Sequence, residues 1–515
     1  MPTPTRSSVA AFEEETTEGV LAAEEAADFV PLRDGFDMKP DFESLDSDEI
    51  INDIGATKSY QGKAIPKGTF PMYLRHSGTA GTAPEYAVLI KSAMGTQTNN
   101  GTEYSVTAGS SAGTSAARGS LEMAANDEDN FLDGQAVLIK DGVNGYSIRN
   151  VYDVNSAGNQ LDLNFNIATA PASGVALGKA NHFSPASDDH VTFSAYHYGA
   201  SSGSDYKQAI SGCRTTSINM DFPANGFATI NFDIEGIEHY WNFMEVTSSN
   251  NKINFKEAGG GAELTATLDS EVYNSPLELA AEVASKMTAA STLSRTYTVS
   301  FNSSTGKFTI SVATFLSILW KTGTNGSDNT DTHAGTLLGY SDAADDTGAV
   351  TYDSDNAQTY SPSVTPTYDG QDNIVLKASE LMIGGYADYT TRKVIKASCT
   401  IGTPKTDVPD LANARGIDSS LIASREAVFT CTILMLEHEA ELYDRFLNNT
   451  TSSLMFNTGH KSAGNWVAGK CFNLYFPNCT LRKVSNIDND GYRVFEIEAK
   501  AFVDSSQKDV HINYI

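Results

Sequence analysis

The chain has 515 residues, of which 40% are hydrophobic, and this length predicts about three folded units. Such a composition supports ordinary buried cores, so it excludes a wholly disordered chain. The 64 acidic and 35 basic residues give a net charge of −29. This charge excludes a sequence-reading nucleic-acid binder, because most of the surface repels phosphates.

Neither a membrane span nor an export signal is expected. The best apolar candidate, 313–320, has the length of a strand and is too short to cross a bilayer. The first residues lack the apolar segment of a secretory signal. The cysteines include no CxxC pair, which is typical of reduced thiols in a cytosol. They are Cys213, Cys399, Cys431, Cys471 and Cys479.

The first 58 residues are expected to form a solvated acidic arm. Residues 1–60 hold 15 Asp and Glu against 4 Lys and Arg, and their apolar groups follow no clear period. Such a segment orders only against a partner surface. A strand signal follows at 59–75, interrupted by a Pro-Lys-Gly turn at 66–68.

A small β-barrel insert is predicted over 101–190. The stretch 96–119 is rich in Gly, Thr and Ser, which is typical of a linker. Strand-like runs follow at 134–140, 146–154 and 160–167. Asp-Gly, Asn-Gly and Gly-Asn pairs between them indicate tight turns.

The clearest hairpin lies at 215–235, where two alternating runs flank a turn containing Asn225 and Gly226. One face is apolar and carries Ile218, Met220, Phe222, Ala228, Ile230, Phe232 and Ile234. The other is polar and acidic and carries Ser217, Asn219, Asp221, Thr229, Asn231, Asp233 and Glu235. The pattern predicts an antiparallel pair with one wet face.

Residues 242–370 are predicted to form an α+β insert. Ser275 and Glu278 make a capping box, with a proline at the first helical position, for a helix that runs to Ala290. Strands are expected at 297–301 and 307–312.

The section 371–515 returns to strands, which are expected at 425–436, 471–476, 480–487 and 492–502. A helix is expected at 437–448, with Leu442 and Phe446 on its apolar stripe.

Short patterns that resemble enzyme motifs are incomplete. His438 and Glu439 begin a zinc motif, but Leu442 stands where a second histidine is needed. Fragments of a penicillin-recognising enzyme begin at Ser204, Lys321 and Ser327, and they come in the wrong order. We therefore expect no catalytic residue and no cofactor.

An acidic run at 486–491 is similar to the start of a calcium-binding loop. Ile497 replaces the glutamate that such a loop needs, so a hairpin turn explains the run better. We expect no dedicated metal site, and only weak surface Ca²⁺ binding stays open.

Three separated stretches resemble tail tube proteins of tailed bacteriophages. The first contains 13–19 (EEETTEG), 29–32 (FVPL) and 39–49 (KPDFESLDSDE). The second is the hairpin with its flanks, which starts GCRTTSINMDFPANG at 212 and continues to 236. The third contains 428–436, 445–450 (RFLNNT), 476–480 (FPNCT) and 492–504 in the family's order.

The resemblance implies a mainly β fold, a tail-tube β-sandwich or barrel with a long hairpin and a short flanking helix. The tube body would comprise 59–100, 191–241 and 371–515. The small β-barrel insert and the α+β insert would be added to this body, and insertion suggests that they face outward.

The resemblance also implies rings, usually hexamers, that stack into a hollow tube of the virion tail and conduct DNA during ejection. The partners would be other copies of the chain, a tape-measure protein, and tail terminator and tip proteins. DNA would pass without sequence-specific binding, and no membrane would be involved. Assembly would take place in the cytoplasm of the bacterial host.

Two groups of candidate residues follow from the resemblance. The polar hairpin face would line the lumen with Asn219, Asp221, Asn231, Asp233 and Glu235, and the apolar face would pack against the helix at 437–448. The arm would contact the adjacent ring through Phe29, Leu32, Phe42, Asp46, Asp48 and Glu49. For the polar hairpin face, the competing interpretation is the solvent side of an ordinary sandwich. For the arm, the competing interpretation is a disordered terminal tail without a role.

Two further alternatives stay open. In the first alternative, the chain is another virion component, such as a decoration, baseplate or tail-tip protein. Such a decoration protein binds a lattice that it does not form. In the other alternative, 242–370 binds a host glycan or receptor through the aromatic platforms Tyr273, Tyr297, Trp320 and Tyr340.

Overall fold

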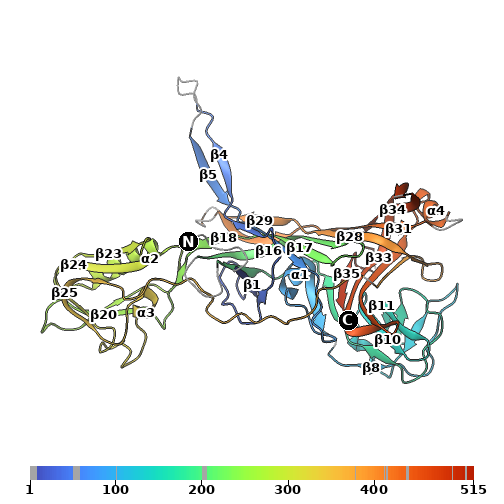
Figure 1. The fold of residues 1–515 in the computed structure, drawn as a ribbon, viewed down its shortest axis with the longest axis horizontal. Helices are drawn as coiled ribbons and strands as arrows, with labels where there is room; N and C mark the ends of the chain where they lie inside the picture. Colours follow the sequence, from blue (N-terminus) through green and yellow to red (C-terminus); the bar gives the residue numbers. More distant parts are fainter. Residues whose placement is uncertain are drawn as a thin grey trace. The chain divides into compact units, whose positions relative to one another are not determined.

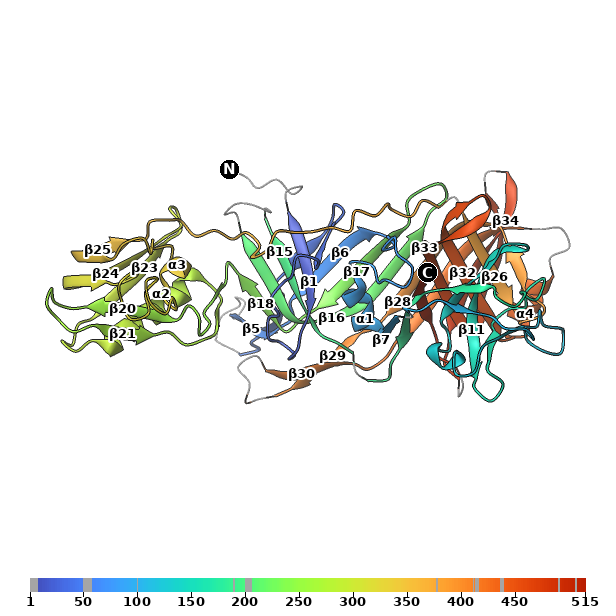
Figure 2. The same ribbon diagram turned by 90° about the horizontal axis from the view of Figure 1, so that it is seen from below.

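The computed structural model describes residues 8–515, except 50–57, 100, 189, 200–205, 377, 411, 413–415, 436–439, 490 and 505–506. The chain is mainly β and divides into two compact units (Figures 1 and 2). The first unit contains Met1–Ala10, Tyr196–Ala209 and His239–Thr365. The second unit contains Ala11–Ala195, Ile210–Glu238 and Pro366–Ile515.

One large antiparallel sheet dominates the second unit. Its hydrogen-bonded neighbours follow the order β3 (Asp37–Lys39), β6 (Lys67–Tyr73), β17 (Thr229–Glu235), β16 (Lys207–Phe222), β28 (Val394–Gly402), β31 (Glu426–Leu434), β34 (Tyr492–Ala501) and β33 (Asn465–Asn489). The hairpin predicted at 215–235 is confirmed as the pair β16–β17, in which Asn219 lies opposite Asn231.

The sheet continues beyond β33, whose 25 residues are enough to pair with several strands. This one long strand replaces the two that were expected at 471–476 and 480–487. Besides β34, it pairs with β32 (Ser452–Ser462) and β35 (His511–Tyr514). The path then leads from β32 to β26 (Ser379–Gly384) and β27 (Thr390–Arg392), and from β35 to β14 (Asn181–Pro185) and β7 (Gly95–Asn99). The same sheet includes β1 (Val9–Glu14), β2 (Phe29–Val30), β15 (Phe193–Tyr198) and β18 (Glu238–Trp241).

Alternation of side chains gives this sheet one apolar and one polar face. In β17 the side chains of Ile230, Phe232 and Ile234 are buried, and the residues between them are half-exposed. The neighbouring β6 repeats the pattern with Phe70 and Met72. Burial of each such side chain stabilises the fold by about 2 kcal/mol.

The helix that flanks the hairpin is α1 (Ala87–Met94), which the sequence analysis did not identify. Tyr86 directly before it contacts Phe232 with a ring distance of 5.7 Å, and the carbonyl of Leu89 accepts a hydrogen bond from Thr215 Oγ1 at 2.8 Å. The prediction that the apolar face of the hairpin packs against the helix at 437–448 is therefore wrong. The described helix there, α4 (Glu441–Leu447), packs against β33 instead.

The part of the chain predicted to be a small barrel forms a six-stranded sheet within the second unit. Its order is β8 (Tyr104–Ser105), β13 (Ala176–Gly178), β10 (Ala136–Asp141), β11 (Gly145–Asn155), β12 (Gln160–Leu163) and β9 (Ser120–Glu122), and a short helix, η2 (Glu128–Asn130), follows β9. Buried amides join this sheet to the large one, because Asn150 Nδ2 donates to Asn473 Oδ1 at 2.9 Å. This module is thus firmly packed against the body.

The N-terminal region is more ordered than the sequence analysis expected. Val9–Glu14 and Phe29–Val30 are strands of the large sheet, because their apolar side chains are buried in its core. The most continuously exposed described stretch is a separate two-stranded hairpin of β4 (Phe42–Asp46) and β5 (Ser59–Ala64). Figure 1 shows that this hairpin extends away from the sheet of its own unit. A second short pair, β29 (Lys405–Pro409) and β30 (Ile417–Ile422), contacts its base through the ion pair of Lys63 and Asp407.

The first unit is an α+β module with its own core. The sheet contains β20 (Lys252–Lys256), β21 (Leu264–Thr267), β23 (Tyr297–Asn302), β24 (Lys307–Ile318) and β25 (Asp346–Asp353), and β19 (Met244–Glu245) pairs with β22 (Val272–Tyr273). Helix α2 (Pro276–Ala290) starts at the predicted cap, where Ser275 Oγ accepts from the amide of Glu278 at 3.3 Å. A one-turn helix, α3 (Gly335–Leu338), lies between β24 and β25.

Candidate functional site

The candidate site is the polar face of the large sheet, centred on β16 and β17. Asn219 lies opposite Asn231 on one side and Thr400 on the other. Asp221 lies opposite Thr229 and Ser398 in the same way. The antiparallel register therefore places the predicted lumen residues in adjacent rows of one surface.

Asp233 is the centre of a hydrogen-bond cluster on this face. Its carboxylate accepts from Thr69 Oγ1 at 2.9 Å and from Asn219 Nδ2 at 3.4 Å. Asn231 Nδ2 lies 3.5 Å from the same carboxylate. These donors make Asp233 a structural residue as well as a source of negative charge.

The other two acidic residues of the hairpin have different surroundings. Asp221 is exposed near the turn of the hairpin. Glu235 lies at the opposite end, 3.4 Å from Lys67 Nζ, so its charge is partly compensated. Asp221 and Asp233 are therefore the main sources of negative potential on the hairpin.

The polar face continues across strands that the sequence analysis did not connect to the hairpin. Thr400 Oγ1 donates to Asn219 Oδ1 at 3.1 Å, and Ser398 bonds to Thr430 in the next strand. Further along, β31, β33 and β34 carry ion pairs such as Lys500 with Glu426 at 2.7 Å. The alternation of Lys and Glu at 496–500 was a signal for a second wet strand. The face is thus acidic at β16–β17 and charge-balanced at β31–β34.

The candidate arm residues divide into two groups. Phe29 is fully buried in the core of its own subunit, and Leu32 is half-buried. By contrast Phe42, Asp46, Asp48 and Glu49 are exposed on or directly after β4. Any contact with another subunit therefore has to use the second group, because the side chain of Phe29 is already covered.

The aromatic side chains considered for glycan binding belong to the core of the first unit. Tyr273, Tyr297, Trp320 and Tyr340 are all buried, with at most 5% of their surface exposed. Trp320 stacks on Tyr340 at 5.1 Å and donates from Nε1 to Asp346 at 3.0 Å. Since sugar stacking needs an exposed ring face, the interpretation of these four residues as platforms is wrong.

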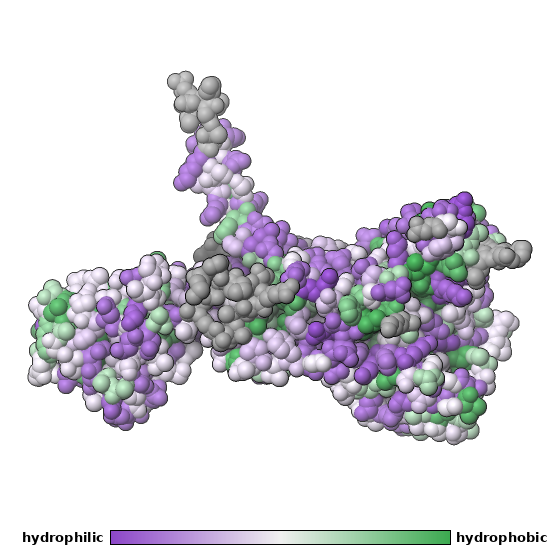
Figure 3. All heavy atoms as spheres, viewed as in Figure 1, coloured by the Kyte–Doolittle hydropathy of each residue, from purple (hydrophilic) through white to green (hydrophobic). Residues whose placement is uncertain are grey.

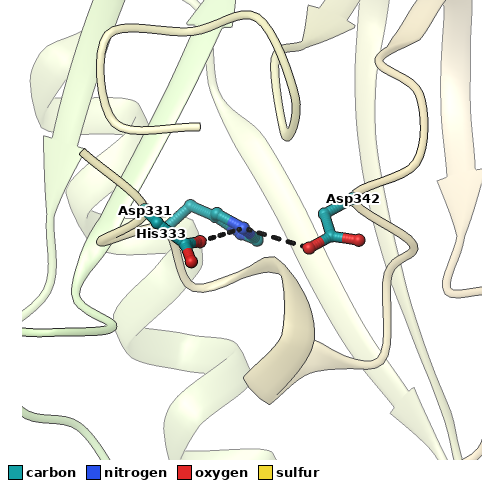
Figure 4. A group of neighbouring side chains, drawn as sticks. All are labelled: Asp331, His333 and Asp342. Carbon is teal, nitrogen blue, oxygen red and sulfur yellow. Dashed lines mark ion pairs between the residues drawn. The ribbon is translucent and has the colours of Figure 1, made fainter. Parts of the chain in front are cut away.

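One cluster in the first unit has a composition that suits a metal ion, namely Asp331, His333 and Asp342 (Figure 4). His333 Nε2 points toward both carboxylates, at 3.4 Å from Asp331 and 3.9 Å from Asp342. However, the amide of Gly335 donates to His333 Nδ1 at 3.0 Å, which places the proton of the neutral ring on Nε2. A metal-binding histidine instead donates from its second nitrogen. The geometry fits a hydrogen-bond donor between two carboxylates and does not fit a metal ligand.

The incomplete enzyme motifs lie in turns or outside the described residues. The motif residues outside the described part of the chain are His438, Glu439 and Ser204. Ser327 Oγ donates to the carbonyl of Asp342 at 3.0 Å and thereby closes a loop. The described start of the calcium-like run, 486–489, is the end of β33, and Asn489 lies opposite Tyr492 of β34.

All five cysteines are buried and unbonded to one another. Burial raises the pKa of the Cys431 and Cys479 thiols to about 12, so they are protonated at neutral pH. A protonated, enclosed thiol is a poor nucleophile, and its role is packing.

Among the described residues, no helix is long and apolar enough to cross a membrane. The sequence matches a family model described as phage tail tube protein over residues 5–314. The chain therefore belongs to the phage tail tube protein family, and it is a structural component of the virion tail that assembles with itself into a tube.

Comparison with other proteins adds little to this assignment. No curated protein matches the sequence. Among solved structures, a double mutant of the Hcp1 protein from E. coli EAEC 042 pathovar shares 15% identity. The match covers 26% of this chain and 95% of that one, with a TM-score of 0.16.

Proposed function

We propose that the chain forms rings of six subunits that stack into a hollow tube, and that the polar face of β16 and β17 lines its lumen. The observation that carries this proposal is the continuous wet face across β6, β17, β16 and β28. A sheet with a solvated face of this width suits the wall of a water-filled channel. Membership of the tail tube family supports the formation of a tube.

Electrostatics suit a channel for DNA. Asp221 and Asp233 place negative charge on the proposed wall, and the paired Lys and Glu of β31 and β34 add no large positive field. A wall of this kind repels phosphates, so the genome slides without sticking. The protein then needs no catalytic residue or cofactor, and its role is that of a conduit.

The remaining partners follow from the same role. A tube of defined length needs a tape-measure protein inside it, and terminator and tip proteins at its two ends. Assembly takes place in the cytoplasm of the bacterial host. The α+β module is the part proposed to face outward, since its sheet and core are independent of the body.

Stacking of rings is assigned to the β4–β5 hairpin, which we call the arm and define as residues 41–49 and 58–64. Its exposed Phe42, Asp46, Asp48 and Glu49 are available to a second copy. Leu32 lies outside the hairpin and is half-buried, so it is at most a peripheral contact.

Electron microscopy of the purified protein over a concentration series tests the proposal. We expect rings at low concentration and hollow tubes at high concentration, with sixfold symmetry in end views. Deletion of the arm is expected to leave rings that do not stack. Particles that stay monomeric in the presence of the other tail proteins would contradict the tube assignment and favour a decoration protein.

A further inference from the structure

A groove of about 650 Å³ lies at the end of the large sheet that is remote from the arm. It is lined by His76, Phe227, Asp372, Asn373, Ile374, Val375, Ala378, Gly459, His460, Lys461 and Lys470. All of these residues belong to the second unit. The groove is therefore defined within one compact body.

The groove combines exposed apolar side chains with basic groups. Phe227 is 47% exposed and Val375 is 38% exposed, although both are large hydrophobic residues. Lys461 and Lys470 contribute two positive charges against the single carboxylate of Asp372. In a chain with a net charge of −29, such a surface suits an acidic partner that also carries apolar groups.

The arm has the complementary composition. Its described residues contain five acidic residues, all in 41–49, against two basic ones, Lys58 and Lys63, so the arm is acidic overall. Lys63 is already paired with Asp407 at the base of the arm. Phe42, Leu45 and Tyr60 are about half exposed on the same hairpin. Figure 3 shows the described part of the arm as mostly hydrophilic surface.

The arm and the groove lie at opposite ends of the same strand. β5 ends at Ala64 and β6 begins at Lys67, so the arm joins the first residue of β6. β6 ends at Tyr73, and His76 of the groove follows three residues later. Seven residues of strand span about 23 Å, so the base of the arm is separated from the groove of its own subunit by about that length. A contact between two such surfaces is heterologous and can be repeated along a stack.

We propose that the arm of one subunit docks into the groove of a subunit in the next ring. This proposal rests on the proposed tube, and it names the surface that receives the arm. Asp46, Asp48 and Glu49 would face Lys461 and Lys470, and the apolar side chains of the arm would cover Phe227 and Val375. Exposed ion pairs are individually weak, but one contact per subunit repeated around a ring adds up to a firm junction.

Charge reversal tests the docking. The variant Lys461→Glu/Lys470→Glu is expected to form normal rings, with the concentration needed for tube formation raised about tenfold or more. The arm variant Asp46→Lys/Asp48→Lys should show the same defect. Combining all four substitutions in one chain should restore tubes. Lys256→Glu/Lys321→Glu makes the same charge change in the other unit and serves as the control.

A cross-linking experiment gives a second readout. A variant with Leu45→Cys is mixed with a variant carrying Val375→Cys and treated with a short bis-maleimide. The five native cysteines are buried and do not compete. Covalent dimers should form in the mixture and not in either variant alone.

The outcomes separate the docking from the tube itself. If the charge-reversal variants form tubes at the same concentration as the wild type, and the cysteine mixture gives no cross-links, the docking is overturned and the tube function is left intact. A wild-type protein that forms no ring or tube would overturn both. Restored stacking in the fourfold variant would support the docking directly, because a merely unfolded groove cannot be rescued by changes in the arm.

Discussion

Thr69 Oγ1 donates a hydrogen bond to Asp233 Oδ1 at 2.9 Å and so links β6 to β17 on the polar face. The two residues also lie opposite each other in the register of the strands. Asp233 thus combines two roles, since the carboxylate that gives the face its charge also holds neighbouring strands together. A test of the charge has to leave this hydrogen bond intact.

The contact itself is expected to contribute modestly to stability. Asp233→Ala should lower the free energy of unfolding by about 1 kcal/mol, and Thr69→Val should have a smaller effect. Asp233→Asn keeps an acceptor for Thr69 and should be milder than Asp233→Ala. A double-mutant cycle measured by urea denaturation reports the coupling between the two residues. Strict additivity of the two substitutions would show that the hydrogen bond contributes nothing.

Asp221 is the better residue for testing the lumen, because it is exposed near the turn of the hairpin. Asp221→Lys should leave folding and tube formation unchanged but slow the release of DNA from phage particles, most strongly at low salt. Glu245→Lys, an exposed position in the α+β module, is the matched control. Equal ejection rates for wild type and Asp221→Lys at low salt would place this residue outside the lumen.

Local patterns in the sequence were sufficient for elements whose partners are close in the chain. The β16–β17 hairpin has its strands and turn within about 20 residues, and the cap at Ser275 contacts Glu278 three residues on. Both predictions are confirmed. Their determinants are steric and hydrogen-bonding preferences of neighbouring residues, which do not depend on the rest of the fold.

Pairing between strands that are far apart in the chain could not be predicted from the sequence. Asn219 lies opposite Thr400, which is 181 residues away, so the width of the polar face and its ion pairs were not predictable. Phe29 illustrates the same limit, since the acidic composition around it gives no sign that its side chain is buried. Helix α1 was missed because its eight residues are too few to show a clear period.

Glu85 is expected to make stability depend on pH. Burial, together with the charge of nearby Asp369, raises the pKa of Glu85 from 4.5 to about 7. Because this pKa is raised, the contribution of Glu85 to folding stability is fully present below pH 4.5 and is lost as the pH rises through 7. Glu85→Gln stays neutral, so the variant should gain stability relative to wild type between pH 5 and pH 8. Denaturation of both proteins at pH 5 and at pH 8 measures this gain. If the difference in unfolding free energy between the variant and the wild type is the same at both pH values, the raised pKa of Glu85 is contradicted.

His182 should give the opposite dependence. Its ring is buried beside His511, and its Nδ1 lies 2.7 Å from Asn513 Oδ1. Burial lowers the pKa of His182 from 6.5 to about 4. Between these values the unfolded chain binds a proton that the folded chain does not, so stability falls on acidification by about 3 kcal/mol for this group. His511, whose pKa is also lowered by burial, should add to the loss. His182→Gln should reduce the difference in unfolding free energy between pH 7 and pH 5, measured by urea denaturation, and an unchanged difference would exclude His182 as its source.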